Sequence, residues 1–331
     1  MTSAAKTGPG GDGRSGACVV IEPRQRNTGP RPDRLPGARL GRHGRARARA
    51  LPSRPRLGIV RLDLSPIGRP MSPLQSMKKY PRTRHLETSR FQHGDHDLEA
   101  VAFKDVKGQF LVVEEKMDGA NAGVSFDPDG RLLLQSRGHY LTGGPRERHF
   151  DLFKQWAHGH AEDLYLALGD RYIMYGEWMY AKHTCFYDAL PAYFMEFDLY
   201  DREQELFLST LRRRQLLADL PVVSVAVLWE GRPQRLSEVT GLIGPSRFKT
   251  PAWRERLVEA GAAAGVPAAQ VLAETDRHDA MEGLYIKVED DERVRDRLKW
   301  VRGSFLSSLA DSGSHWLDRA IVANQLAKAP G

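Results

Sequence analysis

A single lysine, Lys116, stands where an apolar run meets a turn signal. Residues 110–113 (Phe-Leu-Val-Val) are typical of a buried strand, and Asp118-Gly119 is typical of the turn that ends one. Lys116 is therefore expected at a strand end, facing a cleft. An amine there becomes a nucleophile if nearby cations or burial lower its pKa from the usual value of about 10.4. The pattern Lys-x-Asp-Gly also occurs in ordinary turns, so it identifies nothing by itself.

Five further stretches place charged or aromatic side chains on predicted strands after Lys116. In chain order they are Ser136-Arg137-Gly138, Tyr175-Gly176-Glu177-Trp178, the aromatic strand from Phe194 to Asp198, the stretch from Glu282 to Lys287, and Arg297-Leu298-Lys299-Trp300. Side chains alternate along a strand, so Arg297 and Lys299 are expected on one face. The order and the residue types of these stretches carry more weight than any one of them.

Taken together, the six stretches resemble the ordered motifs of the covalent nucleotidyltransferases, which include ATP-dependent polynucleotide ligases and mRNA capping enzymes. Within them the chain is most similar to the RNA ligase 2 family, over roughly residues 77–305. The resemblance implies that Lys116 attacks the α-phosphate of ATP, expels pyrophosphate and becomes a lysine–AMP phosphoramidate. Such a reaction spreads negative charge over phosphoryl oxygens, so cations and a metal ion must meet it.

The resemblance also implies roles for the other motif residues. Glu282 would bind Mg²⁺ or Mn²⁺ through its oxygen atoms. The nucleotide contacts would be Glu115 (its backbone on the adenine edge), Arg137 (phosphate or ribose), Glu177 (ribose hydroxyls), Phe194 (stacking on adenine), and Lys287, Arg297 and Lys299 (phosphate charge). Lys299, with Lys287, is expected to lower the Lys116 pKa by like-charge proximity.

Each of these residues also has a structural alternative. Arg137 and Glu177 would suit an ion pair, Phe194 would suit the core, and Lys287 and Lys299 would suit a solvated strand face. His139 and His183 flank motif positions, and surface loops are the favoured interpretation for both. Residues 212–214 (Arg-Arg-Arg) lie on a predicted helix, where a solvated face is expected rather than a phosphate site.

Two features depart from the pattern of the related enzymes. The last motif usually carries two alternating lysines, but its first position here is Arg297, whose guanidinium supplies charge without the same point contact. Only 32 residues follow Lys299, too few for the oligonucleotide-binding barrel of DNA ligases and capping enzymes. This favours an RNA ligase and leaves open how polynucleotide is gripped.

The predicted elements do not alternate regularly between strand and helix, which argues against a doubly wound parallel sheet. We expect an α+β fold: an ATP-grasp-like nucleotidyltransferase domain over residues 77–331, with antiparallel sheets flanked by helices. Residues 202–275 are interpreted as an inserted helical lobe that could grip polynucleotide. Residues 1–76 hold 14 Arg, 11 Gly and 10 Pro without periodicity, which predicts a disordered extension. An arginine-rich arm for nucleic acid is the alternative interpretation of that segment.

Composition adds limits. The net charge of the 331 residues is +7, but residues 1–76 hold 15 Lys and Arg against 4 Asp and Glu, leaving 34 against 38 in residues 77–331. The predicted domain is thus slightly acidic, and its charge gives no evidence for nucleic-acid binding. Two cysteines and no long apolar run favour a reduced, cytoplasmic setting without a membrane span.

The sequence therefore predicts an ATP-dependent RNA ligase that uses ATP and Mg²⁺ or Mn²⁺. It would seal 5′-phosphate to 3′-hydroxyl RNA ends in RNA repair, with RNA as its partner, in a nicked duplex or an RNA/DNA hybrid. Two alternatives remain at this point. One is an enzyme that seals DNA nicks or only adenylylates itself. The other is a non-catalytic nucleic-acid-binding relative, which the intact set of motif residues argues against.

Overall fold

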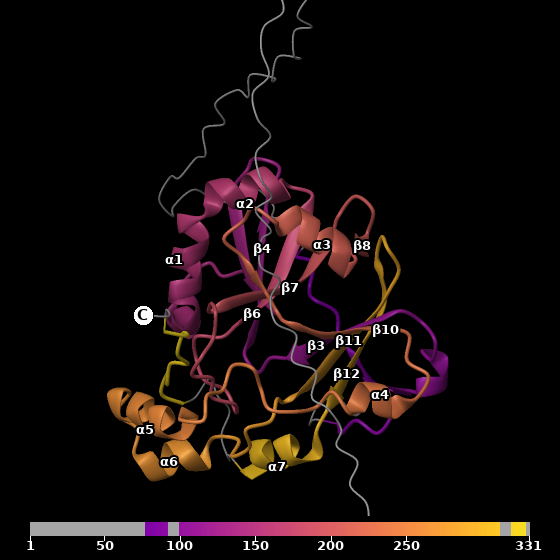
Figure 1. Cartoon of the computed structure of the whole chain (residues 1–331). Coiled ribbons are helices and arrows are strands. Elements are labelled where there is room, and N and C mark those ends of the chain that lie inside the picture. The colour runs from indigo at the N-terminus through magenta and orange to yellow at the C-terminus, as the bar shows by residue number, and fades with distance from the viewer. Residues whose placement is uncertain (1–76, 92–98, 312–318, 329–331) are drawn as a thin grey trace, which may run out of the picture. The chain divides into compact units, whose positions relative to one another are not determined.

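The computed structural model of the chain describes residues 77–91, 99–311 and 319–328. The predicted disordered extension over residues 1–76 lies outside these ranges. Two β-sheets and the helices that pack on them make up the described part of the chain (Figure 1). No helix in these ranges is long and apolar enough to cross a membrane.

Sheet A carries the strand that ends at Lys116. Its strands, in spatial order, are β10 (Val227–Gly231), β3 (Leu111–Lys116), β11 (Gly283–Glu289), β12 (Val294–Val301), β1 (Arg84–Leu86) and β2 (Ala100–Val101). The first four run antiparallel to their neighbours, whereas β1 pairs in parallel with both β12 and β2. The strand predicted to end at Lys116 is therefore confirmed as β3, which lies between the edge strand β10 and β11.

Sheet B is formed by the consecutive strands β4 to β9. Its strands are β5 (Leu132–Ser136), β4 (Ala120–Phe126), β6 (Tyr172–Trp178), β7 (Phe194–Asp201) and β8 (Leu206–Phe207), with β9 (Val223–Ser224) paired in parallel to β7. Only three residues separate β3 from β4, so the Asp118-Gly119 turn joins the two sheets directly.

Seven α-helices occupy the described ranges. They are α1 (Asp151–Gly159), α2 (Ala161–Leu168), α3 (Thr210–Leu217), α4 (Leu236–Thr240), α5 (Trp253–Ala263), α6 (Ala268–Ala273) and α7 (Gly303–Asp311). Phe153 of α1 and Leu164 of α2 are fully buried in the apolar cluster of sheet B, so these helices cover that sheet (Figure 1). The expected α+β fold with antiparallel sheets flanked by helices is confirmed.

The segment 202–275, interpreted from the sequence as an inserted helical lobe, holds α3 to α6 and three strands. Of these, β8 and β9 extend sheet B, and β10 pairs with β3 in sheet A. The helix predicted to carry residues 212–214 is confirmed as α3, and the Ser209 hydroxyl caps its start by accepting the Arg212 N–H at 3.3 Å. A role of this segment in gripping polynucleotide stays a prediction.

The two faces of sheet A differ in character. Leu111 and Val113 point to one face, where they pack with Leu284 and Leu298 in an apolar cluster. Glu114 and Lys116 alternate onto the opposite face. That second face is polar although much of it is buried, so its charges must find partners inside the protein.

Those partners form what we call the six-charge cluster: Glu114, Glu196, Asp198, Arg213, Lys287 and Arg297. Arg213 contacts Glu114 at 2.6 Å and Glu196 at 3.4 Å. Lys287 lies 3.1 Å from Glu114 and 3.2 Å from Asp198, and Arg297 lies 3.1 Å from Asp198. Three carboxylates from both sheets thus meet three cations, and the cluster is formally neutral.

The solvated face expected for residues 212–214 is wrong for Arg213, whose side chain is only 1% exposed. Arg212 is partly exposed and pairs with Glu292, and Arg214 is exposed and pairs with Glu230. The three arginines differ because α3 packs against β7 and turns only the middle one inward. Nothing local in the Arg-Arg-Arg run signals this, since the difference depends on carboxylates that lie far away in the sequence.

We predict that Arg213→Ala lowers the free energy of unfolding by roughly 3–5 kcal/mol, because it leaves buried carboxylates without their cation. Arg212→Ala, the matched control from the same helix, should change it by less than about 0.5 kcal/mol, as is usual for surface sites. Urea unfolding followed by circular dichroism measures both. Equal stability of the two variants would contradict the structural role of the six-charge cluster.

Candidate functional site

The site forms where the last residue of β3 meets the first of β11. The strand register sets Lys116 opposite Gly283, which brings the preceding Glu282 alongside the lysine. Lys116 Nζ lies 2.6 Å from Glu282 Oε1, with side-chain exposures of 22% and 1%. The two residues are 166 positions apart in the sequence, yet they make a direct ion pair.

Two more carboxylates surround this pair. Glu177, on β6, accepts a hydrogen bond from the Gly119 N–H at 3.2 Å. Asp118 accepts the backbone N–H groups of Thr184 at 2.8 Å and Cys185 at 2.5 Å. The sequence analysis treated Asp118 only as a turn residue, although its place in the Lys-x-Asp-Gly motif was a signal that could have identified it.

The carboxylates control the protonation of Lys116. Burial lowers the Lys116 pKa, but the negative charges of Glu282, Glu177 and Asp118 outweigh burial and raise it. Burial also raises the pKa of Glu177 to about 8 and that of Glu282 to about 7, although the Lys116 charge opposes both shifts. The expectation that neighbouring cations lower the Lys116 pKa is therefore wrong for the protein without nucleotide, because carboxylates are its closest charged neighbours.

The three cations predicted to bind phosphate occupy different environments. Lys299 on β12 stands opposite Tyr285 and His85 in the strand register and is half-buried. Its charge acts to lower the Glu282 pKa against the effect of burial, which places it within electrostatic reach of the site. Lys287 and Arg297 pair within the six-charge cluster instead. Their phosphate contacts, like that of Lys299, stay predictions, and a solvated position for Lys287 is wrong.

The remaining predicted nucleotide contacts are more scattered. Glu115 faces away from Lys116 and accepts the Ser246 hydroxyl at 2.5 Å and the Arg247 N–H at 3.4 Å. Phe194 is 3% exposed and packs with Trp156 and Phe153, at ring-centroid distances of 4.9 and 5.3 Å. This packing matches the alternative of a core aromatic, while stacking on adenine stays a prediction.

Arg137 is exposed in the loop after β5 and makes no ion pair with any described residue. It therefore does not form the structural pair with Glu177 that the sequence left open. Among the flanking histidines, His139 is exposed as expected and contacts the Ser136 hydroxyl through Nδ1 at 3.0 Å. His183 is only 6% exposed, so a surface position is wrong for it.

The loop at 182–185 was missed by the sequence analysis apart from His183. Burial, with the charge of Arg319, lowers the Lys182 pKa to about 8. The Lys182 ammonium donates to two backbone carbonyls, those of His183 at 3.0 Å and Glu274 at 2.9 Å. This lysine therefore serves to hold the loop that contacts Asp118.

The residues present fit a divalent ion that is shared with a nucleotide. Among the described residues, no three His, Cys, Asp or Glu side chains are arranged to hold a metal ion by themselves. Mg²⁺ commonly binds one or two protein carboxylates together with substrate phosphates rather than an all-protein cage. Glu282, with Glu177 and Asp118 near the same lysine, supplies oxygen ligands of that kind.

The Lys116–Glu282 pair lies where two mainly antiparallel sheets are joined by the turn after β3. Residues 109–301 match the family model described as RNA ligase. The chain belongs to the RNA ligase family. The matched region contains Lys116, Glu177, Glu282 and Lys299.

Among solved structures, the chain is similar to variants of an RNA ligase from Naegleria gruberi. A lysine-to-alanine variant with ATP and Mn is 18% identical with a TM-score of 0.42, and the match covers 63% of this chain and 53% of that one. A glutamate-to-alanine variant with ATP and Mn is 16% identical with a TM-score of 0.44, covering 71% and 59%. The chain thus spans a little over half the length of these proteins. No curated protein sequence matches it.

The charge balance at the site leads to a prediction that needs no nucleotide. In Glu282→Gln, loss of the neighbouring negative charge should lower the Lys116 pKa and leave more neutral amine at a given pH. Lys116 should therefore react faster with acetic anhydride between about pH 7 and pH 9, a range below the usual lysine pKa. Quantitative mass spectrometry of the peptide containing Lys116 measures the rate, with exposed Lys104 as internal reference. Slower or unchanged acetylation would contradict the pKa argument.

Proposed function

We propose that the chain is an ATP-dependent RNA ligase that joins 5′-phosphate and 3′-hydroxyl RNA ends through a lysyl-AMP intermediate on Lys116. The observation that carries the proposal is the 2.6 Å contact between Lys116 and buried Glu282 within a domain of the RNA ligase family. A lysine held at a strand end beside a buried carboxylate, next to the turn that joins the two sheets, is placed for covalent chemistry.

The first step forms a bond between Lys116 Nζ and the α-phosphorus of ATP and breaks the bond to pyrophosphate, which leaves. The attacking amine must be neutral, so the Lys116 ammonium loses one proton to water, to which its side chain is 22% exposed, and Glu282 releases its hold on Nζ. The nitrogen loses a second proton to water as the N–P bond forms. A bound Mg²⁺ or Mn²⁺ would be held by Glu282 and the phosphates, and would supply positive charge to the phosphoryl oxygens. Without nucleotide, the carboxylates keep Lys116 protonated and unreactive.

Other residues would orient the nucleotide. We assign Glu177 to the ribose hydroxyls, because it lies on the adjoining sheet and carries a raised pKa that suits hydrogen bonding. Lys299 and Arg137 would contact phosphate, and the Glu115 backbone would contact adenine. Lys287 and Arg297 would support the phosphate site through the six-charge cluster, where the structure places them.

The polynucleotide partner we propose is RNA, in a nicked duplex or an RNA/DNA hybrid, and the role is RNA repair. The family match supports RNA as the substrate class. A reduced cytoplasmic setting is consistent with Cys185, which is buried and unpaired with another cysteine among the described residues. Burial also raises the pKa of this thiol, which makes it unreactive.

Lys116→Arg should abolish covalent AMP attachment while leaving the fold intact, because arginine keeps the charge but is not deprotonated in proteins. The test is incubation with α-labelled ATP and Mg²⁺ or Mn²⁺, followed by denaturing electrophoresis. Lys104→Arg, an exposed lysine of η1 (Phe103–Asp105), is the matched control and should label like the wild type.

Parallel incubations with labelled GTP and NAD show which nucleotide the protein uses, and sealing assays with RNA or DNA ends show which polynucleotide it joins. Persistent labelling of Lys116→Arg would contradict the assignment of Lys116 as the nucleophile. Labelling without sealing of any RNA end would restrict the function to self-adenylylation, and preferred sealing of DNA would replace RNA as the substrate. An unlabelled wild type would point to a non-catalytic relative.

Arg137→Ala should weaken nucleotide or RNA-phosphate binding without changing the melting temperature, since Arg137 has no ion-pair partner among the described residues. Loss of one charge-assisted hydrogen bond raises a KM by roughly tenfold or more. The control is Arg131→Ala, an arginine in the preceding turn that pairs with Asp127 and Asp129. Steady-state adenylylation and sealing rates give the KM values, and equal values for both variants would exclude Arg137 from the site.

A further inference from the structure

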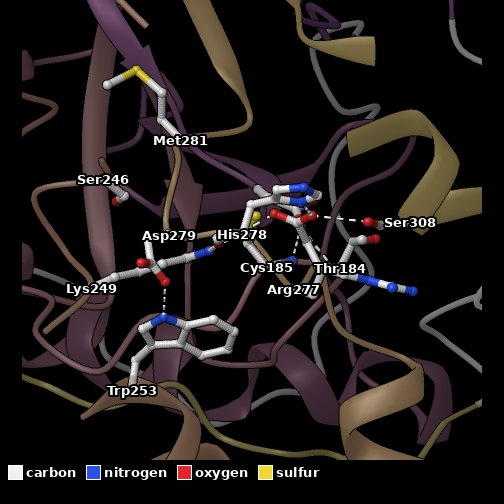
Figure 2. A network of polar contacts seen from close by, with 12 residues as sticks. Thr184, Cys185, Ser246, Lys249, Trp253, Arg277, His278, Asp279, Met281 and Ser308 are labelled. Carbon is white, nitrogen blue, oxygen red and sulfur yellow. Dashed lines mark hydrogen bonds and ion pairs between the residues drawn. The ribbon is translucent and has the colours of Figure 1, made fainter. Parts of the chain in front are cut away.

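A second set of contacts links the turn after Lys116 to the backbone of Glu282 through Thr184, Asp276 and Arg302, which lie outside the six motifs. It is centred on Asp276, a fully buried residue of the loop between α6 and β11. Figure 2 shows several of the surrounding residues, with Thr184, Cys185, His278 and Ser308 gathered around one point. The contacts lead from Asp276 in two directions, and each direction ends at one member of the Lys116–Glu282 pair.

The first direction ends beside Lys116. The Asp276 N–H donates to the Thr184 carbonyl at 2.7 Å. The Thr184 N–H in turn donates to the Asp118 carboxylate at 2.8 Å, and the Cys185 N–H donates to the same oxygen at 2.5 Å. Asp118 lies two residues after Lys116, so these bonds fix the turn that follows the lysine.

The second direction ends at Glu282. The Asp276 carboxylate forms an ion pair with the Arg302 guanidinium, and both side chains are almost completely buried. Arg302 Nε donates to the Met281 carbonyl at 2.7 Å, and the Arg302 N–H donates to the Glu282 carbonyl at 3.3 Å. Arg302 therefore holds the backbone on both sides of the Glu282 side chain.

The charges at the centre are strongly held. Asp276 Oδ1 also accepts the Ser308 hydroxyl at 2.9 Å and contacts His278 Nδ1 at 3.0 Å. Burial raises the Asp276 pKa, but these partners and Arg302 outweigh burial and lower it, so the carboxylate stays ionised. Removing one partner of a buried ion pair leaves an uncompensated charge, so the arrangement tolerates little displacement.

We propose that Asp276 and Arg302 are positioning residues for nucleotidyl transfer. Neither contacts Lys116 directly in the structure, yet together they fix the turn after Lys116 and the backbone that carries Glu282. Together with the Lys116–Glu282 ion pair, these contacts form a closed ring of interactions, which we call the Asp276–Arg302 ring. The position of the Lys116 amine therefore depends on the ion pair between Asp276 and Arg302, which it does not touch. This inference rests on the proposed function, because it assigns a role within the same reaction.

The first experiment measures single-turnover lysyl-AMP formation by Asp276→Asn. Substituting a residue that orients a functional group without touching the substrate typically lowers activity by roughly ten- to a hundredfold, and we expect a loss in this range. The matched control is Asp201→Asn, which also removes a buried carboxylate paired with an arginine, Arg171, and bonded to backbone N–H groups. That pair lies at the far end of β7 and should leave the rate within about twofold, as expected for an independent site.

A second readout needs no nucleotide. If Asp276 holds the turn after Lys116, Asp276→Asn should make hydrogen exchange of the peptide spanning residues 116–120 faster, because the Thr184 backbone that donates to Asp118 loses its support. Asp201→Asn should leave exchange of this peptide unchanged. A general loss of stability would instead raise exchange throughout sheet B as well.

Arg302 provides the conservative test. Arg302→Lys keeps the charge but not the planar guanidinium that reaches Asp276 and the Met281 carbonyl together. It should therefore lower the rate of lysyl-AMP formation as Asp276→Asn does. Because it keeps a positive charge beside Asp276, it should unfold at a higher temperature than Arg302→Gln. Hydrogen exchange of the peptide spanning residues 280–284, measured without nucleotide, should be faster in Asp276→Asn and Arg302→Lys than in Asp201→Asn.

The outcomes separate the two proposals. Wild-type hydrogen-exchange rates for both peptides in folded Asp276→Asn and Arg302→Lys would overturn the positioning role, whether or not the chain forms lysyl-AMP. Absence of lysyl-AMP in the wild type would overturn the proposed function, while the exchange measurements still decide whether Asp276 and Arg302 hold the backbone around Lys116 and Glu282. If Asp276→Asn does not fold, Arg302→Lys carries the test alone.

Discussion

The buried cluster of six charges between the two sheets is the constraint on which the rest of the structure depends. Burying a charge is costly unless it is paired and hydrogen-bonded, so each carboxylate of the cluster requires its cation. Glu114, Lys287 and Arg297 come from sheet A, Glu196 and Asp198 from sheet B, and Arg213 from α3. Separating the sheets would strand charges on both sides, so the cluster favours one relative position for them.

That position determines the site. Lys116 lies two residues beyond Glu114 on β3, and Glu177 lies on β6, which pairs with the strand that carries Glu196 and Asp198. The cluster is neutral, whereas three carboxylates gather near Lys116. The contrast has a chemical consequence, because the carboxylates raise the Lys116 pKa and so keep the lysine protonated. Preorganised charge of this kind is a common source of catalytic power.

Two sets of buried charges support the site. The six-charge cluster holds the strands of the two sheets together, and the contacts of Asp276 and Arg302 hold the turn after Lys116 and the residues around Glu282. Both are formed by buried ion pairs rather than apolar packing alone. Such pairs are directional, so they specify the positions of reacting groups more sharply than a hydrophobic contact of the same size.

The sequence by itself determined the strand that ends at Lys116, the α+β class, the helix that carries residues 212–214 and the resemblance to RNA ligases. These depend on local periodicity, turn residues and motif order, all of which are readable along the chain. Only the tertiary structure decided that Arg213 is buried while Arg214 is exposed, that Lys287 pairs with Glu114, and that Glu282 raises the Lys116 pKa. The physical reason is that charge interactions depend on distance in space. Glu114 lies 99 residues before Arg213 and 173 before Lys287, and Glu282 lies 166 residues after Lys116.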